Sequence, residues 1–292
     1  MIFRILIFVV LVTCAAAQNP LTFERGFRDL RVSPDGDFML YNQTNQPGLY
    51  LYRTSEGSSI KIAGGVGRAR GAHWSLDSRY IAFKHIHKTE TARMQTPMVF
   101  DTERQQLIAL SDAHRRCGIP TFSEKNTVYF TIDHILYEQT LNGTVLRQFE
   151  LPVYANRTPV NRQGTAVVYN DDNDQLWLLS LNDNLSEPIT RGNMGYYSPQ
   201  WSPDGSKILF NGFDGQLYVY QMPHQTIVNL GRGQHPSWLQ NSERLIFSMP
   251  EINASGQLQN IDLWTVDIKN QQRKRLAHTE AWEDFPAPMP NS

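Results

Sequence analysis

Short apolar runs, separated by Gly, Asn, Asp and Pro, make up most of the chain after its N-terminal segment. The runs at 80–83, 176–179 and 217–220 are typical, and they are rich in aromatic and branched apolar residues. Such runs, bounded by turn-forming residues, predict β-strands. No segment beyond the N-terminal one sustains the apolar period of a helix, so we expect an all-β protein.

A four-residue turn recurs along the chain at a nearly constant spacing. Ser33-Pro34-Asp35-Gly36 and Ser202-Pro203-Asp204-Gly205 are identical, and weaker copies lie between and after them. Serine caps such a turn, proline presets φ and glycine relieves crowding, as in a type I turn between antiparallel strands. The residues just before the turns lie 37 to 48 positions apart, which is the length of a propeller blade. These anchor residues are Val32, Trp74, Phe122, Val160, Trp201 and Trp238.

Each repeat contains four apolar runs, one before the turn and three after it. Six four-stranded antiparallel units predict a six-bladed β-propeller, whose circular arrangement leaves only short, protected edges. A β-sandwich is the alternative fold, but it does not require a turn repeated at this spacing. The segment 284–288 resembles the first strand of a seventh unit, and we expect six full blades with this segment as a closing strand.

The N-terminal segment has the pattern of a secretory signal. Arg4 is followed by the apolar run 5–12, and three alanines at 15–17 suit a cleavage site. The predicted organisation is therefore a signal peptide at 1–17 and one propeller domain at 18–292. The apolar run is too short to span a bilayer, so we expect a secreted or periplasmic protein without a transmembrane segment. Lipid attachment at Cys14 is the alternative.

The formal charge of −1 and the absence of a basic tract argue against a nucleic-acid partner.

After cleavage the remaining cysteine is Cys117, which we expect to be a small buried residue; a reactive or intermolecular thiol is the alternative. We expect a monomer that needs no cofactor or metal. Asparagine sequons occur that would be glycosylation sites in a eukaryote and would have no such role in a bacterium. They are at Asn42, Asn142, Asn156, Asn184 and Asn253.

The phrase at 199–210, followed by 215–220, resembles the repeat of the TolB-like propellers and of the propeller domains in the prolyl-oligopeptidase family. The resemblance extends over essentially all of the chain after the signal segment. It implies a secreted propeller that binds another protein, since TolB contacts a peptidoglycan-associated lipoprotein in the periplasm. The resemblance covers only the propeller portion of TolB, and we expect no counterpart of the α/β domain that precedes it there. The resemblance therefore does not imply a full role in the Tol–Pal system. The chain also contains no Gly-x-Ser-x-Gly nucleophile elbow of the hydrolases.

In propellers of this kind, the strand before the repeated turn lies nearest the axis. The residues three and four positions before each anchor should therefore surround one mouth of the channel. Arginines at this mouth suit an acidic peptide end or another carboxylate-bearing partner. The alternative is that these are solvated loop residues that pair with one another. The predicted binding residues are Arg28, Arg70, Asn156, Arg157, Tyr197, Gln234 and His235, with Asp284 from the C-terminal segment.

Three further groups have weaker chemical signatures. His85 and His87 share one face of a strand, as two metal ligands would, but no third ligand is evident and a solvated edge is the simpler interpretation. The acidic loop 171–174 has oxygens for calcium, yet it lacks the pattern of an EF-hand, and a hairpin turn is the simpler interpretation. His73 and His235 lie on predicted axial strands, where a metal-dependent lyase built on a propeller could use them.

The sequence thus favours a non-catalytic protein-interaction module that binds another envelope or secreted protein or a peptide. The first alternative is a hydrolase or lyase that acts on a glycan or peptide at the channel mouth. The second is a purely structural component of the envelope.

Overall fold

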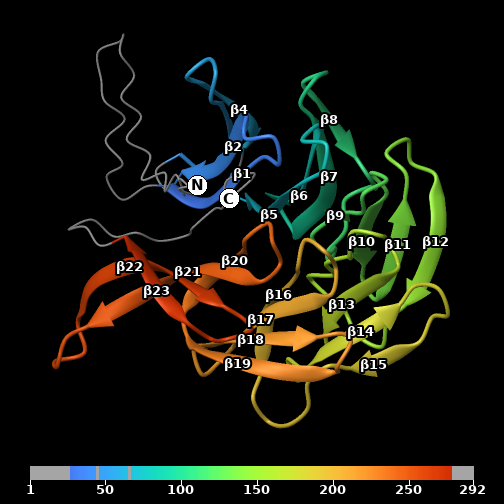
Figure 1. Ribbon diagram of the computed structural model, residues 1–292. Coiled ribbons are helices and arrows are strands. Elements are labelled where there is room, and N and C mark those ends of the chain that lie inside the picture. The colour runs from blue at the N-terminus through green and yellow to red at the C-terminus, as the bar shows by residue number, and fades with distance from the viewer. Residues whose placement is uncertain (1–26, 44–45, 65–66, 278–292) are drawn as a thin grey trace.

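The computed structural model describes residues 27–43, 46–64 and 67–277, except for the side chains of 27–29, 67–70 and 277. These residues form 23 strands, and none of the described chain is helical. The strands are grouped into six antiparallel sheets, which follow one another in chain order around a ring (Figure 1). The expected all-β, six-bladed propeller is therefore confirmed. No helix in the described part of the chain is long and apolar enough to cross a membrane.

Each blade takes its strands from one continuous segment. Blade 1 has β1 (Phe27–Val32), β2 (Phe38–Gln43), β3 (Gly48–Arg53) and β4 (Ser58–Gly64); blade 2 has β5 (Gly67–Trp74), β6 (Tyr80–Lys88), β7 (Arg93–Asp101) and β8 (Gln106–Ala109). Blade 3 has β9 (Thr121–Phe122), β10 (Val128–Ile132), β11 (Ile135–Gln139) and β12 (Val145–Glu150); blade 4 has β13 (Ala166–Asn170), β14 (Leu176–Ser180) and β15 (Ser186–Pro188). Blade 5 has β16 (Tyr196–Trp201), β17 (Lys207–Gly212), β18 (Gln216–Gln221) and β19 (Thr226–Arg232); blade 6 has β20 (Gln234–Trp238), β21 (Arg244–Ile252), β22 (Leu258–Asp267) and β23 (Arg273–Ala277).

The innermost strand of blade 4 is reduced to a single bridge, between Val160 and Val167. Pro159 directly precedes this bridge. Proline has no amide hydrogen to donate to a strand ladder, which limits regular pairing at this position. The blade therefore has three full strands and a residual fourth, where the repeat predicts four complete ones.

The repeated turn has the geometry expected from its residues. The Ser202 hydroxyl donates to Asp204 at 2.6 Å and accepts from the amide of Lys207 at 2.9 Å, at the start of β17. Gly205 adopts a φ of 73°, which glycine tolerates without strain. The turns also join consecutive blades, because the Asp204 amide donates to the hydroxyl of Ser242 in blade 6 at 3.0 Å.

Five apolar clusters hold the ring together, one between each pair of consecutive blades from 1–2 to 5–6. Between blades 4 and 5, for example, Val168 and Leu176 of blade 4 pack with Ile208 and Phe210 of blade 5. Burial of such side chains stabilises each interface by roughly 1.5–3 kcal/mol per residue. The core of the protein is thus divided among the blade interfaces.

Bulges interrupt the inner strands shortly before the anchors. The pairing register shifts between Tyr197 and Gln200 in β16 and between Gln234 and Ser237 in β20. Each shift contains a proline, Pro199 or Pro236, which cannot donate to the ladder. A bulge accommodates such a residue and redirects its neighbours, so it changes which side chains face the channel mouth.

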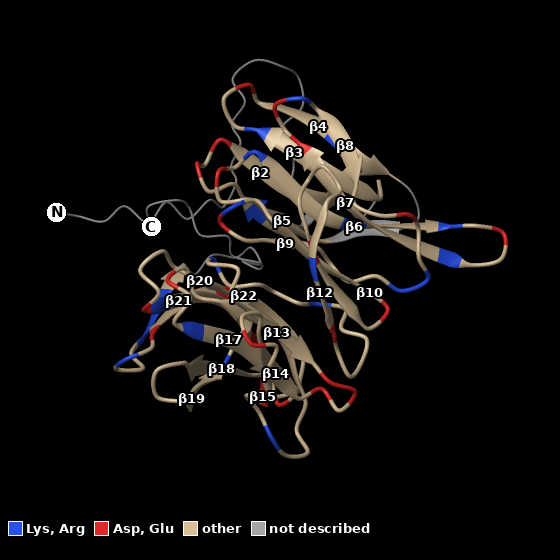
Figure 2. Ribbon diagram, turned by 90° about the vertical axis from the view of Figure 1, so that its right-hand side faces the viewer, with Lys and Arg blue, Asp and Glu red and all other residues tan. Residues whose placement is uncertain are grey.

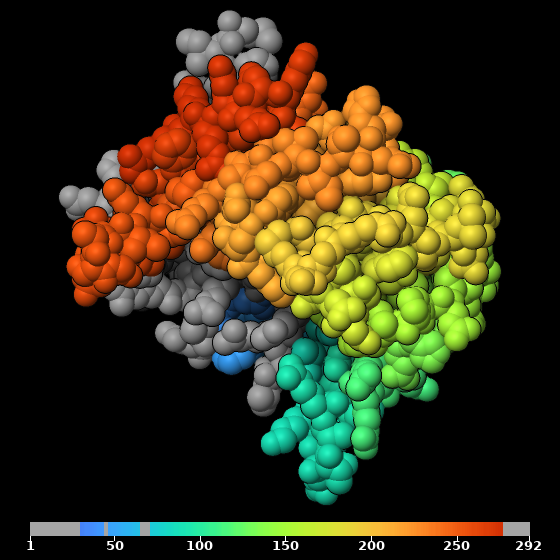
Figure 3. All heavy atoms as spheres, turned by 90° about the horizontal axis from the view of Figure 1, so that it is seen from below, coloured from blue at the N-terminus to red at the C-terminus, as the bar shows by residue number. Residues whose placement is uncertain are grey.

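One hairpin is longer than its counterparts in the neighbouring blades. Strands β6 and β7 have nine residues each and project beyond the ring with the connecting residues 89–92 (Figures 2 and 3). Arg93 lies at the start of β7 on this projection, which we call the β6–β7 arm. The arm rises on the side of the ring where the inner strands begin, because Ile86 of β6 pairs with Gly67 of β5.

Candidate functional site

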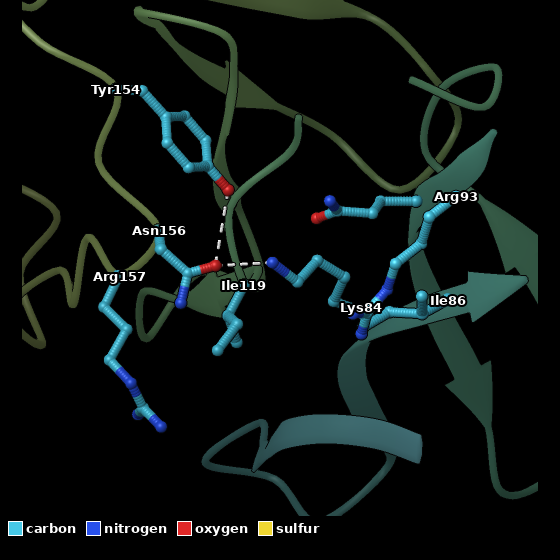
Figure 4. A pocket seen from close by; sticks show the side chains of 8 residues that line it. Lys84, Ile86, Arg93, Ile119, Tyr154, Asn156 and Arg157 are labelled. Atoms are coloured by element: carbon cyan, nitrogen blue, oxygen red, sulfur yellow. Dashed lines mark hydrogen bonds between the residues drawn. The ribbon is translucent and has the colours of Figure 1, made fainter. Parts of the chain in front are cut away.

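A cavity of about 240 Å³ opens beside the base of the β6–β7 arm (Figure 4). Its walls come from blade 2, from the segment before β9 and from the segment that leads into blade 4. Among the described residues that line it, every charged side chain is cationic and none is a carboxylate. The eight lining residues are Lys84, Ile86, Arg93, Gln95, Ile119, Tyr154, Asn156 and Arg157.

Lys84 is the most deeply buried of these cations, at 5% exposure. Its ammonium group donates to the carbonyl of Cys117 at 2.9 Å and to Oδ1 of Asn156 at 2.5 Å. A buried ammonium group is costly unless its hydrogens find acceptors, and these two contacts provide them. The positive charge of Lys84 is therefore held in a fixed place at the wall of the cavity.

Asn156 has a defined orientation because two donors share its carbonyl oxygen. Besides Lys84, the hydroxyl of Tyr154 lies 3.3 Å from Oδ1 and also donates to the Cys117 carbonyl at 2.8 Å. With Oδ1 occupied, the Asn156 amide group points the other way (Figure 4) and remains available as a donor. Burial raises the pKa of Tyr154 to about 12, with a further contribution from Cys117, so the phenol stays neutral at physiological pH.

Gln95 adds one acceptor to a cavity lined mainly by donors. Its Nε2 donates to the carbonyl of Arg115 at 2.8 Å. Its Oε1 is buried and has no hydrogen-bond partner among the described residues. The remaining polar groups are the guanidinium groups of Arg93 and Arg157, so an acceptor-rich anion matches the lining.

The positive character continues from the cavity toward the axis. His73 of β5 is half-buried, and burial lowers its pKa well below 6.5, with Arg31 and Arg157 lowering it further. Both arginines therefore lie close enough to His73 to disfavour its charged form. Arg157 belongs both to this axial group and to the cavity lining.

The structure brings together some of the residues predicted for the channel mouth. Asn156 and Arg157 line the cavity, and the backbone of Arg70 pairs with that of Lys84. Arg28 pairs with Asn42 in the β1–β2 ladder, and the side chains of Arg28 and Arg70 lie outside the described atoms. Asp284 lies outside the described residues altogether.

The predicted residues of blades 5 and 6 lie in the exposed first parts of their inner strands. Tyr197 is 41% exposed and stacks on Phe213, with ring centroids 5.4 Å apart. Gln234 and His235 begin β20 and are exposed, and His235 has a φ of 48° within the bulge. Among the described residues that line the cavity, none of these three is included.

Sequence reasoning missed most of the residues that line the cavity, and also the aromatic partner of Tyr197. Lys84, Arg93 and Tyr154 line the cavity, and Phe213 partners Tyr197. Lys84 was detectable in principle, because a lysine that directly follows the apolar run 81–83 in the middle of a β-strand is unusual. Nothing in the sequence indicated that Arg93 or Tyr154 would reach the same cavity.

The weaker chemical candidates have structural roles. The thiol of Cys117 is fully buried, as expected, and burial raises its pKa to about 11. His85 and His87 stack at 5.7 Å, and Nε2 of His85 lies 3.1 Å from the carbonyl of Gly64. Asp171 accepts from the amides of Asn173 and Gln175 and from the indole of Trp177, so its oxygens organise the hairpin. Within the described residues, no three His, Cys, Asp or Glu side chains are placed to hold a metal ion.

No protein-family model matches the chain, and no curated protein matches it in sequence. Among solved structures, a chain of a mitotic checkpoint complex is similar, with a TM-score of 0.66 and 11% identity over 94% of this chain and 90% of that one. Oligogalacturonate lyase in complex with manganese has a TM-score of 0.63 and 14% identity over 85% of this chain and 79% of that one. TolB from Acinetobacter baumannii has a TM-score of 0.60 and 13% identity over 90% of this chain, which spans 65% of the TolB chain. At these identities the likeness concerns the fold, and it confirms the TolB-like propeller expected from the repeat.

Proposed function

We propose that the protein is a secreted or periplasmic interaction module that binds a carboxylate-bearing segment of another envelope or secreted protein. The observation that carries this proposal is the cavity beside the β6–β7 arm, in which Lys84, Arg93 and Arg157 are the charged lining residues. The signal-like segment 1–17 supports a location outside the cytoplasm. The similarity to TolB, a propeller of the same type, is compatible with it.

The chemistry of the lining favours a carboxylate over a neutral ligand. Guanidinium and ammonium groups donate charge-assisted hydrogen bonds, each of which contributes about 1.5–3 kcal/mol. Lys84 is already held in place by Cys117 and Asn156, so little side-chain entropy is lost when a ligand binds. A neutral ligand would leave three positive charges without compensation from the ligand.

The test is a titration with two acetylated, amidated peptides in a glycine–serine background, one with two glutamates and the other with two glutamines. We expect measurable binding only of the glutamate peptide. Binding should weaken about tenfold or more in the Arg157→Ala variant, because one charge-assisted hydrogen bond is removed. The matched control is Arg232→Ala, which removes an exposed arginine from the outer strand of blade 5 and should change nothing.

Two further measurements make this test more specific. A glutamine peptide with a free C-terminus distinguishes a terminal carboxylate from an acidic side chain. The triple variant Arg28→Ala, Arg70→Ala, Arg157→Ala should abolish binding altogether, since it removes the predicted arginines of the mouth. Equal binding of the glutamate and glutamine peptides by the unaltered protein would rule the proposal out.

A second candidate function is a lyase that acts on an acidic glycan at the same mouth. The cationic cavity also suits the carboxylate of a uronic acid, and His73, whose lowered pKa keeps it neutral, could accept a proton. Oligogalacturonate lyase shares the propeller fold. Incubation with oligogalacturonate, with and without manganese, decides between the two: a rise in ultraviolet absorbance from an unsaturated product, lost in His73→Gln, would favour the enzyme.

A further inference from the structure

A pair of exposed aromatic side chains lies on blade 5, apart from the cavity. Tyr197 of β16 and Phe213 of the β17–β18 hairpin are 41% and 62% exposed. Their rings are stacked, with centroids 5.4 Å apart and planes 28° from parallel. Exposed apolar side chains that adjoin one another on a protein surface often mark an interaction site.

The backbone beneath the pair is adapted to hold it in place. The amide of Phe213 donates to the carbonyl of Gly195 at 3.0 Å. A Cβ at Gly195 would approach the Phe213 ring to 2.5 Å, so only glycine allows the ring to lie this close to the chain. The ring position is therefore built into the hairpin, which lowers the entropy cost of binding.

The surroundings of the pair are acidic. A Cβ at Gly195 would also lie 3.0 Å from the Cβ of Asp174, which places the blade 4 hairpin directly beside the Phe213 ring. The amide of Tyr196 donates to the Asp174 carbonyl at 2.8 Å and fixes this arrangement. Asp172 and Asp174 are exposed, and within the described part of the chain neither forms an ion pair. Their negative charge is therefore not neutralised by a neighbouring lysine or arginine.

We propose that Tyr197 and Phe213 form a docking platform for an arginine side chain of a partner protein. A guanidinium group stacks on an aromatic face through its planar, weakly hydrated cation, and a flanking carboxylate strengthens the contact. The platform is flanked by carboxylates, whereas the cavity is lined by cations. Binding of an arginine to the platform does not depend on the function proposed for the cavity. A partner segment that carries both an acidic and a basic group would match the two surfaces together.

The test uses an acetylated, amidated peptide with two arginines in a glycine–serine background, and its counterpart with citrulline in place of arginine. Citrulline keeps the planar shape and removes the charge. Binding is followed by calorimetry and by the backbone amide signals of Gly195 and Gly212. We expect the arginine peptide to bind and to shift these signals, and the citrulline peptide to bind at least threefold more weakly, in line with about 0.5–2 kcal/mol for a cation–π contact.

Three variants separate the aromatic contribution from other effects. Phe213→Leu keeps an apolar side chain but has no ring face, and it should lose most of the binding. Leu185→Ala removes another exposed apolar residue, 67% exposed, and should bind normally. Arg157→Ala, which tests the cavity, should also leave arginine-peptide binding unchanged, so the two proposals fail independently. Equal affinity for arginine and citrulline, or unchanged binding by Phe213→Leu, would overturn the platform.

Discussion

The indole of Trp201 donates a hydrogen bond of 2.9 Å to the carbonyl of Pro159, in the blade before its own. The other two tryptophan anchors repeat this contact: Trp74 reaches the carbonyl of Arg31 at 3.5 Å, and Trp238 that of Gln200 at 3.3 Å. Each acceptor lies one position before the anchor of the preceding blade. The anchor tryptophans thus join the inner strands of consecutive blades by a directed bond as well as by packing.

The Trp201 bond has a measurable contribution to stability. Trp201→Phe removes the donor but keeps most of the apolar ring, and we expect the free energy of unfolding to fall by about 1–3 kcal/mol. Trp201→Ala also creates a cavity between blades 4 and 5, and should cost about 3–5 kcal/mol. Urea titrations followed by circular dichroism measure both. Equal stability of Trp201→Phe and the unaltered protein would show that the hydrogen bond contributes nothing.

Gly71 connects backbone geometry to the cavity. It has a φ of 68°, and a Cβ there would approach side-chain carbons of Ile119 to 2.6 and 2.8 Å. Ile119 lines the cavity. Gly71→Ala should therefore destabilise the protein by about 1–3 kcal/mol and weaken peptide binding at the same site. Gly143→Ala is the matched control, because its φ is also positive but nothing lies within 4 Å of the added Cβ; it should lower stability only and leave binding intact.

Lys84 offers a way to separate stability from binding. Lys84→Met replaces the buried ammonium group by an apolar side chain of similar length. The carbonyl of Cys117 keeps its bond from Tyr154, so this acceptor remains satisfied. Since the cost of burying the charge also disappears, we expect stability to change by less than about 1 kcal/mol. Binding of the glutamate peptide should nevertheless fall about tenfold or more. A large loss of stability with normal binding would assign Lys84 a purely structural role.

His73 should make the protein less stable in mildly acidic solution. Burial and the two arginines lower its pKa in the folded state well below 6.5, so the unfolded chain binds its proton first. Stability should therefore decrease as the pH falls below about 6.5, until the folded-state pKa is reached. His73→Gln should flatten this slope in unfolding titrations between pH 7 and pH 5, about the range in which histidine normally titrates. Carboxylates with lowered pKa values, such as Asp77 and Asp204, act below this window, near and below 3.8. A slope that persists in His73→Gln would contradict the assignment.

Cys117 should be unreactive while the protein is folded. Its thiol is fully buried, and its pKa is raised to about 11, so almost no thiolate forms at neutral pH. A thiol reagent should modify the chain cleaved after Ala17 only as fast as the chain unfolds, and in denaturant the reaction should be rapid. Rapid modification of the folded protein would show that the thiol is accessible.

The fold could be predicted from the sequence because its signal is local and repeated. Ser202, Asp204 and Gly205 determine the geometry of one turn through contacts within a few residues, and the same residue types recur in other blades. The incomplete inner strand of blade 4 was harder to foresee, since it depends on the position of Pro159 relative to the ladder.

The site was only partly predictable, because it depends on contacts between distant segments. Counting back from the anchors identified Asn156 and Arg157, which lie on the strand path nearest the axis. It did not identify Lys84, whose partner Asn156 is 72 positions away along the chain. The stacking of Phe213 on Tyr197 also depends on the close approach of the ring to Gly195. The repeat in the sequence does not indicate this contact.

The outer part of the β6–β7 arm, residues 84–96, supplies one wall of the cavity but adds no apolar side chain to the clusters between the blades. The tip at 89–92 can therefore be lengthened, shortened or exchanged with little effect on how the propeller folds. Ile86, Arg93 and Gln95 lie on either side of this tip and line the cavity, so an engineer who wishes to retarget the protein should begin with these arm residues.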